Sequence, residues 1–218
     1  MAIGLRSSAE ARNTGTTNHL VTTPSGAAIG DVLYGIWYAV GSAVWTAPSG
    51  WTPLINVDSA TYGSILICRL VLSGAPASDY TATTAANEST WGLLTAWTGV
   101  DTTTPEDVAT DSDQNALGTY TTPSIVTATA GAVLLCYWAQ GANLAITVDG
   151  ATTPIDAGAL GPSYGASYEV IASPGATGTR TATGMNNNNT TASVAIRPYV
   201  APPAGGVANS SMLMGVGI

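Results

Sequence analysis

Few residues of this chain could support catalysis, and their spacing does not assemble a site. Ser163 lies in GPSYG, the pattern of a nucleophile elbow, which needs a following helix and a later acid and histidine. No helix is expected after Ser163, and the one histidine, His19, comes near the start of the chain. His19, Cys68 and Cys136 also lack the closely spaced ligand pairs of a zinc site. We therefore expect a loop at Ser163, and no catalytic residue, metal or cofactor.

An acidic stretch is the second candidate for chemistry. DSDQNALG, which begins at Asp111, alternates oxygen-bearing side chains as a calcium-binding loop does. The EF-hand pattern fails, because Ala116 occupies the position that requires glycine and Thr122 the position of the bidentate glutamate. Two interpretations stay open, a calcium site of another type and a solvated acidic loop.

Tryptophans give a third candidate, because an aromatic face can stack on a sugar ring. Trp45 and Trp51 stand on either side of the turn TAPSG. Core packing is the favoured interpretation for both, and they are also the best candidates for a contact with a glycan or a partner. The other four tryptophans lie inside apolar runs, where core packing is expected: Trp37, Trp91, Trp97 and Trp138.

Composition restricts the partners of the chain. Its 218 residues carry a net charge of −8, with five arginines and no lysine, so binding to nucleic acid is not expected. The longest apolar run, SILICRLVL from Ser64, contains Arg69 and is too short to span a bilayer, so no membrane association is expected. Nor is a secretory signal recognisable at the start of the chain. Cys68 and Cys136 are too few for a disulfide framework, so we expect reduced thiols in the core.

The chain repeats itself at an offset of about 100 residues. GDVLYGIWYA from Gly30 resembles GAVLLCYWAQ from Gly131, and TAT occurs at both Thr81 and Thr181. Such self-similarity indicates an internal duplication, with halves at about 30–98 and 130–197. Apolar runs of period two, separated by turn-forming residues, predict ten strands and no helix. The expected strands are 30–40, 51–57, 62–72, 79–84, 90–98, 130–139, 143–148, 164–172, 177–184 and 190–197.

These strands predict an all-β fold, a jelly-roll-like antiparallel β-sandwich built from two similar halves over a single core. One domain at 17–198 is expected, because all-β domains of this size are common. In SILICRLVL the face of Leu66 and Cys68 is expected to point into the core, and the face of Ile65 and Ile67 away from it.

Two terminal arms are expected outside the sandwich, an N-terminal arm at 1–16 and a C-terminal arm at 199–218. The second runs from a Pro- and Gly-rich linker into an apolar segment. That segment could cover its own sandwich or insert into a neighbouring subunit. The residues of this candidate assembly arm are Met212, Leu213, Met214, Val216 and Ile218. Because lysines commonly guard exposed sheet edges, their absence predicts edges covered by neighbours and a homo-oligomer.

Several elements in a fixed order, from about residue 20 to 198, resemble a family of jelly-roll domains in virion proteins of tailed bacteriophages, especially those of actinobacteria. The elements are GDVL at Gly30, PSGWT at Pro48, LICRLV at Leu66, PASDYT at Pro76, WTGVDTTTP at Trp97, GATGTRTAT at Gly175 and VAIRP at Val194.

The resemblance implies a non-enzymatic structural protein of the virion, assembled in the host cytoplasm with other virion proteins. A minor tail or tail-tip component is the favoured expectation, and a capsid decoration protein on the head surface is the first alternative. A second alternative, from a different class, is a carbohydrate-binding adhesion module that contacts host glycans through Trp45 and Trp51.

Overall fold

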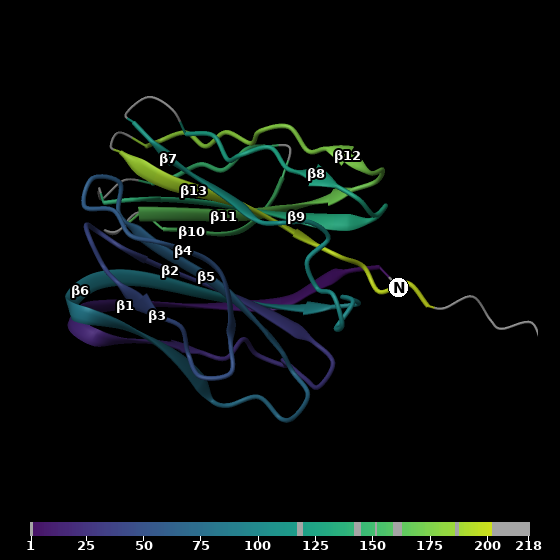
Figure 1. Cartoon of the computed structure of the whole chain (residues 1–218), viewed down its shortest axis with the longest axis horizontal. Helices are drawn as coiled ribbons and strands as arrows, with labels where there is room; N and C mark the ends of the chain where they lie inside the picture. The colour runs from purple at the N-terminus through teal and green to yellow at the C-terminus, as the bar shows by residue number, and fades with distance from the viewer. Residues whose placement is uncertain are drawn as a thin grey trace, which may run out of the picture.

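The computed structural model describes residues 2–116, 120–141, 145–150, 152–158, 163–185 and 188–201. Within these ranges the chain forms thirteen strands and no helix, and two antiparallel sheets pack face to face, which confirms the all-β sandwich (Figure 1). The first sheet contains β1 (Gly4–Thr22), β2 (Val32–Ala39), β3 (Trp45–Thr46), β4 (Thr52–Val57), β5 (Ser64–Val71) and β6 (Asp79–Thr98). The second contains β7 (Asp111–Asn115), β9 (Ala132–Gln140), β10 (Thr153–Gly158), β11 (Ser163–Ile171) and β13 (Asn189–Ile196). A separate small ribbon pairs β8 (Val126–Thr127) with β12 (Gly175–Ala176).

The two sheets have the same topology, as two similar halves should. The order is β1-β6-β2-β5-β4 in the first sheet and β7-β13-β9-β11-β10 in the second, so strands of the same rank in each half occupy the same place. The register repeats as well. Trp37 pairs with Leu66 and Gly92 in the first sheet, and Trp138 pairs with Gly165 and Thr191 at the corresponding positions of the second.

In the part of the chain that the structure describes, the buried apolar side chains form three separate cores, not the single core that the sequence predicted. A shared core lies between the two sheets and receives side chains from both. A first outer core covers the opposite face of the first sheet, and a second outer core covers the opposite face of the second sheet. Both faces of β2, β5 and β9 are therefore buried, so Ile65 and Ile67, expected to point away from the core, lie in the shared core.

In each half, segments of the chain fold back over the outer face of the sheet and cover its outer core. In the first half the far portions of β1 and β6, together with β3, bring Val21, Ala82 and Trp45 over the sheet. In the second half, connecting segments that contain Ile125, Ile146 and Ala182 take the same place. The TAT repeats are equivalent here, because Thr83 pairs with Thr46 in one half and Thr183 bridges Thr147 in the other.

Each outer core is built around one of the two repeated tryptophans. The Trp37 indole N–H donates to the His19 carbonyl at 3.0 Å, and the Trp138 indole N–H donates to the Tyr120 carbonyl at 3.0 Å. His19 and Tyr120 are equivalent positions of the two halves. Both rings are fully buried, so these bonds satisfy donors that would otherwise cost about 1–3 kcal/mol each.

Several strand predictions need correction. Segments 79–84 and 90–98 are one continuous strand, β6. Segment 177–184 and the described part of 143–148 form only isolated bridges. The predicted N-terminal arm, 1–16, is also wrong as a free arm, because its residues from Gly4 onward belong to β1 and pair with β6. Backbone hydrogen bonds hold this strand, so its small polar side chains gave no apolar period to detect.

The C-terminal arm falls almost wholly outside the described residues. The chain can be followed through Tyr199, whose N–H donates to the Gly99 carbonyl at 2.8 Å, to Ala201. The prediction for Met212, Leu213, Met214, Val216 and Ile218 therefore lies outside the described residues.

Replacement of Gly35 by alanine tests the packing of the first outer core. A Cβ atom at this position would lie 2.5 Å from Trp37 Cζ3 and 2.8 Å from Leu94 Cδ2, so the Trp37 ring must move. We expect Gly35→Ala to lower the free energy of unfolding by about 1–3 kcal/mol, measured by urea denaturation. The control is Gly74→Ala, which meets open space and should change stability by less than about 0.5 kcal/mol. Equal midpoints for the two variants would contradict this packing.

Candidate functional site

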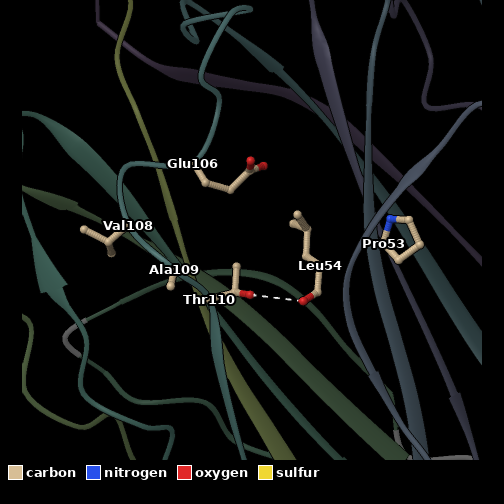
Figure 2. Close-up of a pocket in the computed structure, with 6 residues that line it drawn as sticks. All are labelled: Pro53, Leu54, Glu106, Val108, Ala109 and Thr110. Carbon is tan, nitrogen blue, oxygen red and sulfur yellow. Dashed lines mark hydrogen bonds between the residues drawn. The ribbon is translucent and has the colours of Figure 1, made fainter.

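A groove lies at one side of the sandwich. It runs between the edge strand β4 and the segment that leads into β7, and its volume is about 420 Å³ (Figure 2). Thr110 Oγ1 donates to the Leu54 carbonyl at 3.4 Å across it. Sequence reasoning missed this groove, because one wall belongs to β4 and the other to the connection between the halves, about fifty residues later in the chain. The lining residues are Pro53, Leu54, Glu106, Val108, Ala109 and Thr110.

The carboxylate of the groove is already neutralised. Glu106 Oε2 accepts from Arg69 Nε at 2.8 Å, and Glu106 Oε1 accepts from the Tyr34 hydroxyl at 3.1 Å. Burial, with the charge of Glu106, raises the pKa of Tyr34 well above its ordinary value, so this hydroxyl stays protonated as a donor. The two bonds join β2 and β5 to the connection between the halves. Glu106 is thus engaged in holding the two halves together.

The structure does not bring together the parts of a hydrolase site. Ser163 is fully buried as the first residue of β11, which is a strand and not the predicted loop, and no helix follows it. His19 is fully buried in the first half, where its Nε2 lies 2.7 Å from Thr84 Oγ1 and its Nδ1 2.8 Å from Thr90 Oγ1. With both ring nitrogens engaged by threonines, His19 has no free nitrogen to act as a base for Ser163.

The acidic stretch is a strand, not the loop that the sequence predicted. Asp111 to Asn115 form β7, which pairs with β13, and the side chains of Asp111 and Asp113 are exposed. Asp111 Oδ1 accepts from the Ser112 N–H at 2.8 Å. Among the described residues, no cluster of three His, Cys, Asp or Glu side chains could hold a metal ion.

Trp45 and Trp51 are not on the surface, which corrects the candidate glycan contact. They are 3% and 6% exposed and belong to the first outer core. Trp45 meets the His19 ring edge to face at 5.1 Å between centroids, and Trp51 meets the Tyr80 ring at 5.0 Å. Because the far portions of β1 and β6 fold over them, neither face is open to a sugar ring. This long-range covering leaves no local signal in the sequence around TAPSG.

Both cysteines are free and buried, as expected. Burial raises the pKa of Cys136 to about 12 and raises that of Cys68 further. Thiols with such pKa values remain protonated at neutral pH and are poor nucleophiles, so they act as small apolar core residues.

The sheet edges are protected without lysine, which removes one argument for covered edges. The edge strands β4 and β10 each contain a proline followed by a bulge, at Pro53 and Pro154. β1 has three register shifts, and β7 is short and presents Asp111 and Asp113 to solvent. Prolines, bulges and charges all discourage pairing with a further strand. The oligomer that the sequence predicted therefore needs support other than the absence of lysine.

His19 makes the stability of the fold dependent on pH. Its burial lowers its pKa below the ordinary value of 6.5, so the folded chain takes up a proton less readily than the unfolded chain. The contribution of His19 to stability should be constant above about pH 6.5 and should fall as the pH drops below it, because protonation then favours the unfolded state. The carboxylate of Asp58 has a lowered pKa, through hydrogen bonds from Ser64 and Ser42, and its effect appears only below about pH 4.

We expect His19→Gln to flatten the dependence of unfolding free energy on pH between about 4.5 and 6.5. Glutamine is neutral throughout this range and keeps hydrogen-bonding groups for Thr84 and Thr90. Urea denaturation at a series of pH values measures the slope. The same slope in the variant as in the natural chain would contradict a buried neutral His19.

No helix among the described residues is long and apolar enough to span a membrane. Comparison of the chain with protein-family models, with curated proteins and with solved structures finds no match in any of the three. The functional argument therefore depends on the residues and contacts of this chain.

Proposed function

We propose that this chain is a non-enzymatic structural protein of a tailed-bacteriophage virion, with a minor tail or tail-tip position favoured over the head surface. The single observation that supports a structural role is that the side chains able to act as acids, bases or nucleophiles are taken up by contacts within the fold. Glu106 pairs with Arg69, His19 with two threonines, and Cys68 and Cys136 lie within the outer cores. The virion assignment itself rests on the resemblance of the sequence elements from Gly30 to Val194.

The packing between the halves supports a rigid block. Trp91 stacks on Tyr164 with ring centroids 3.6 Å apart, and Trp97 meets Tyr168 edge to face at 5.2 Å. In each pair the tryptophan comes from the first sheet and the tyrosine from the second. Aromatic pairs of this kind add about 0.5–1.5 kcal/mol each beyond their buried area. A component that carries mechanical load needs such a connection between its parts.

The adhesion-module alternative loses the two side chains that were its candidate glycan contacts, because Trp45 and Trp51 are buried. A glycan-binding module would need other contact residues. The groove beside β4 offers few, because its lining is mainly small and apolar and its one carboxylate, that of Glu106, is paired with Arg69. The experiment must therefore distinguish a position of this chain on the tail from a position on the head.

Immunogold electron microscopy with antibodies against the purified chain tests the proposal on particles from a culture that carries the gene. We expect gold at the tail or tail tip, and none on particles whose gene for this chain has been deleted. Gold on the head would support the capsid decoration alternative in place of a tail position. Intact particles without gold, with the chain free in the lysate, would overturn the virion assignment.

Removal of residues 204–218 separates a role in assembly from a role in folding. Among the described residues, each of the three cores is built from residues at or before Ile196. If these cores carry the stability of the sandwich, the melting temperature should change by less than about 2 °C. Incorporation into particles should be lost, as measured by immunoblotting of purified virions. A large drop in melting temperature would show that the segment belongs to its own sandwich.

A further inference from the structure

The first outer core lies under a layer formed by three paired segments. These segments are residues 18–22 of β1, residues 79–84 of β6, and β3. Their inner face brings Val21, Ala82 and Trp45 into the core, where all three side chains are buried. We call this three-stranded layer the cover.

A break in the pairing of β1 with β6 separates the cover from the regular part of the sheet. Thr16 pairs with Glu88 and Asn18 pairs with Thr83, so a single residue of β1 stands opposite residues 84–87 of β6. Such irregularities interrupt the ladder of backbone hydrogen bonds and bend the strands. The cover can therefore move away from the sheet while the ladder between β6 and β2 stays intact.

His19 connects the cover with the sheet beneath it. Its Nδ1 lies 2.8 Å from the Thr90 hydroxyl in the regular part of β6, and its Nε2 lies 2.7 Å from the Thr84 hydroxyl at the edge of the cover. The Thr84 hydroxyl donates to the Ala86 carbonyl at 2.8 Å, so it can only accept from His19. Nε2 therefore carries the proton of a neutral imidazole, and Nδ1 accepts from Thr90.

A protonated His19 has no counter-charge in this core. Its second N–H, at Nδ1, would face the buried Thr90 hydroxyl, which would have to turn its own proton away from the ring. The other titratable side chains that pack here are Cys68 and Tyr80, a thiol and a phenol, and neither supplies a negative charge at acid pH. Burial is the cause that lowers the pKa of His19. Because an unpaired buried cation is strongly unfavourable, protonation favours a state that exposes the ring to water.

The charged side chains on the strands around His19 do not compensate for this burial. Glu10 and Arg12 of β1 contact a tyrosine of the second sheet, and Asp79 accepts from a serine at the surface. β2 and β3 contain no acidic or basic side chain. Glu88 lies on β6 beside the break, and no hydrogen bond or ion pair among the described residues joins it to His19.

The first outer core also contains two buried donors without a partner. The indole N–H groups of Trp45 and Trp51 have no hydrogen-bond acceptor among the described residues. An unpaired buried donor is unfavourable, whereas water satisfies it when the core opens. Exposure of these two groups therefore offsets part of the free energy needed to open the cover.

The second half has an equivalent outer core but no histidine. The Tyr120 carbonyl accepts from the Trp138 indole there, as the His19 carbonyl accepts from the Trp37 indole in the first half. His19 is the one histidine of the chain. Titration of histidine therefore acts on the first outer core and has no counterpart in the second.

We infer that mildly acidic conditions open the cover of the first half through protonation of His19, while the two sheets and the second outer core stay folded. Opening exposes Trp37, Trp45 and Trp51, so the chain presents an aromatic surface in acid that it does not present at neutral pH. This acid-sensitive cover goes beyond the proposed function and does not depend on it. Its test uses purified protein, so either proposal can fail alone.

The two buried cysteines are matched probes of the two outer cores, because Cys68 lies in the first and Cys136 in the second. Labelling with 4,4′-dithiodipyridine, a thiol reagent that stays reactive in acid, is followed at each cysteine by mass spectrometry. Each rate is divided by the rate of the same cysteine in the denatured chain at the same pH. Far-ultraviolet circular dichroism checks that the sheets remain folded.

We expect the relative labelling rate of Cys68 to rise by about tenfold or more between about pH 7.5 and pH 5. The upper limit is about thirtyfold, set by a histidine that has its ordinary pKa of about 6.5 in the open state. At about pH 5 the relative rate of Cys68 should exceed that of Cys136 by about tenfold or more, because global unfolding would expose both thiols equally.

Two variants identify the group that takes up the proton. His19→Gln should abolish the acid-dependent rise at Cys68, and the control Glu88→Gln should keep it. His19→Asn replaces His19→Gln if circular dichroism shows that the glutamine variant does not fold. Equal relative rates for the two cysteines at about pH 5 would overturn the inference, because the opening would then be global. A rate at Cys68 that does not change with pH, or a rise that persists without His19, would also overturn it.

Discussion

Burial of both faces of the central strands β2 and β9 is the constraint on which the rest of the molecule depends. Each strand lies between the shared core and an outer core, so the side chains on both of its faces are buried, and most of them are apolar. The outer cores then require a further layer, which the folded-back portions of β1 and β6 supply in the first half and connecting segments in the second. Trp37 and Trp138 mark the centres of these cores.

The repeated topology of the two halves explains why one chain can contain three cores. Each half has its own five-strand order, its own buried tryptophan and its own outer core, and the shared core is the contact between the two halves. The connection at Glu106 adds a polar link, because its carboxylate binds Arg69 and Tyr34 of the first half. An internal contact of this kind joins the two halves into a single block.

Features that depend on local sequence patterns, namely several strands and the division into two halves, could be predicted from the sequence. Apolar runs of period two located β2, β5, β9, β11 and β13, and the repeated Trp-bearing segment revealed the two halves. The sequence could not predict β1, whose small polar residues are held by backbone bonds to β6, far along the chain. Core packing was the favoured interpretation for Trp45 and Trp51, but which segments cover them could not be predicted, since the covering strands are distant in the sequence. The stretch at Asp111 has the composition of a loop, but pairing with β13 makes it a strand.

Cooperativity of unfolding tests the central claim, that a shared core unites the two halves into one block. Differential scanning calorimetry of the full chain measures it directly. If the shared core carries much of the stability, neither half persists without the other, and a single transition should appear with equal calorimetric and van't Hoff enthalpies. Two separate transitions, or a calorimetric enthalpy about twice the van't Hoff value, would show that the halves unfold independently and would contradict this account.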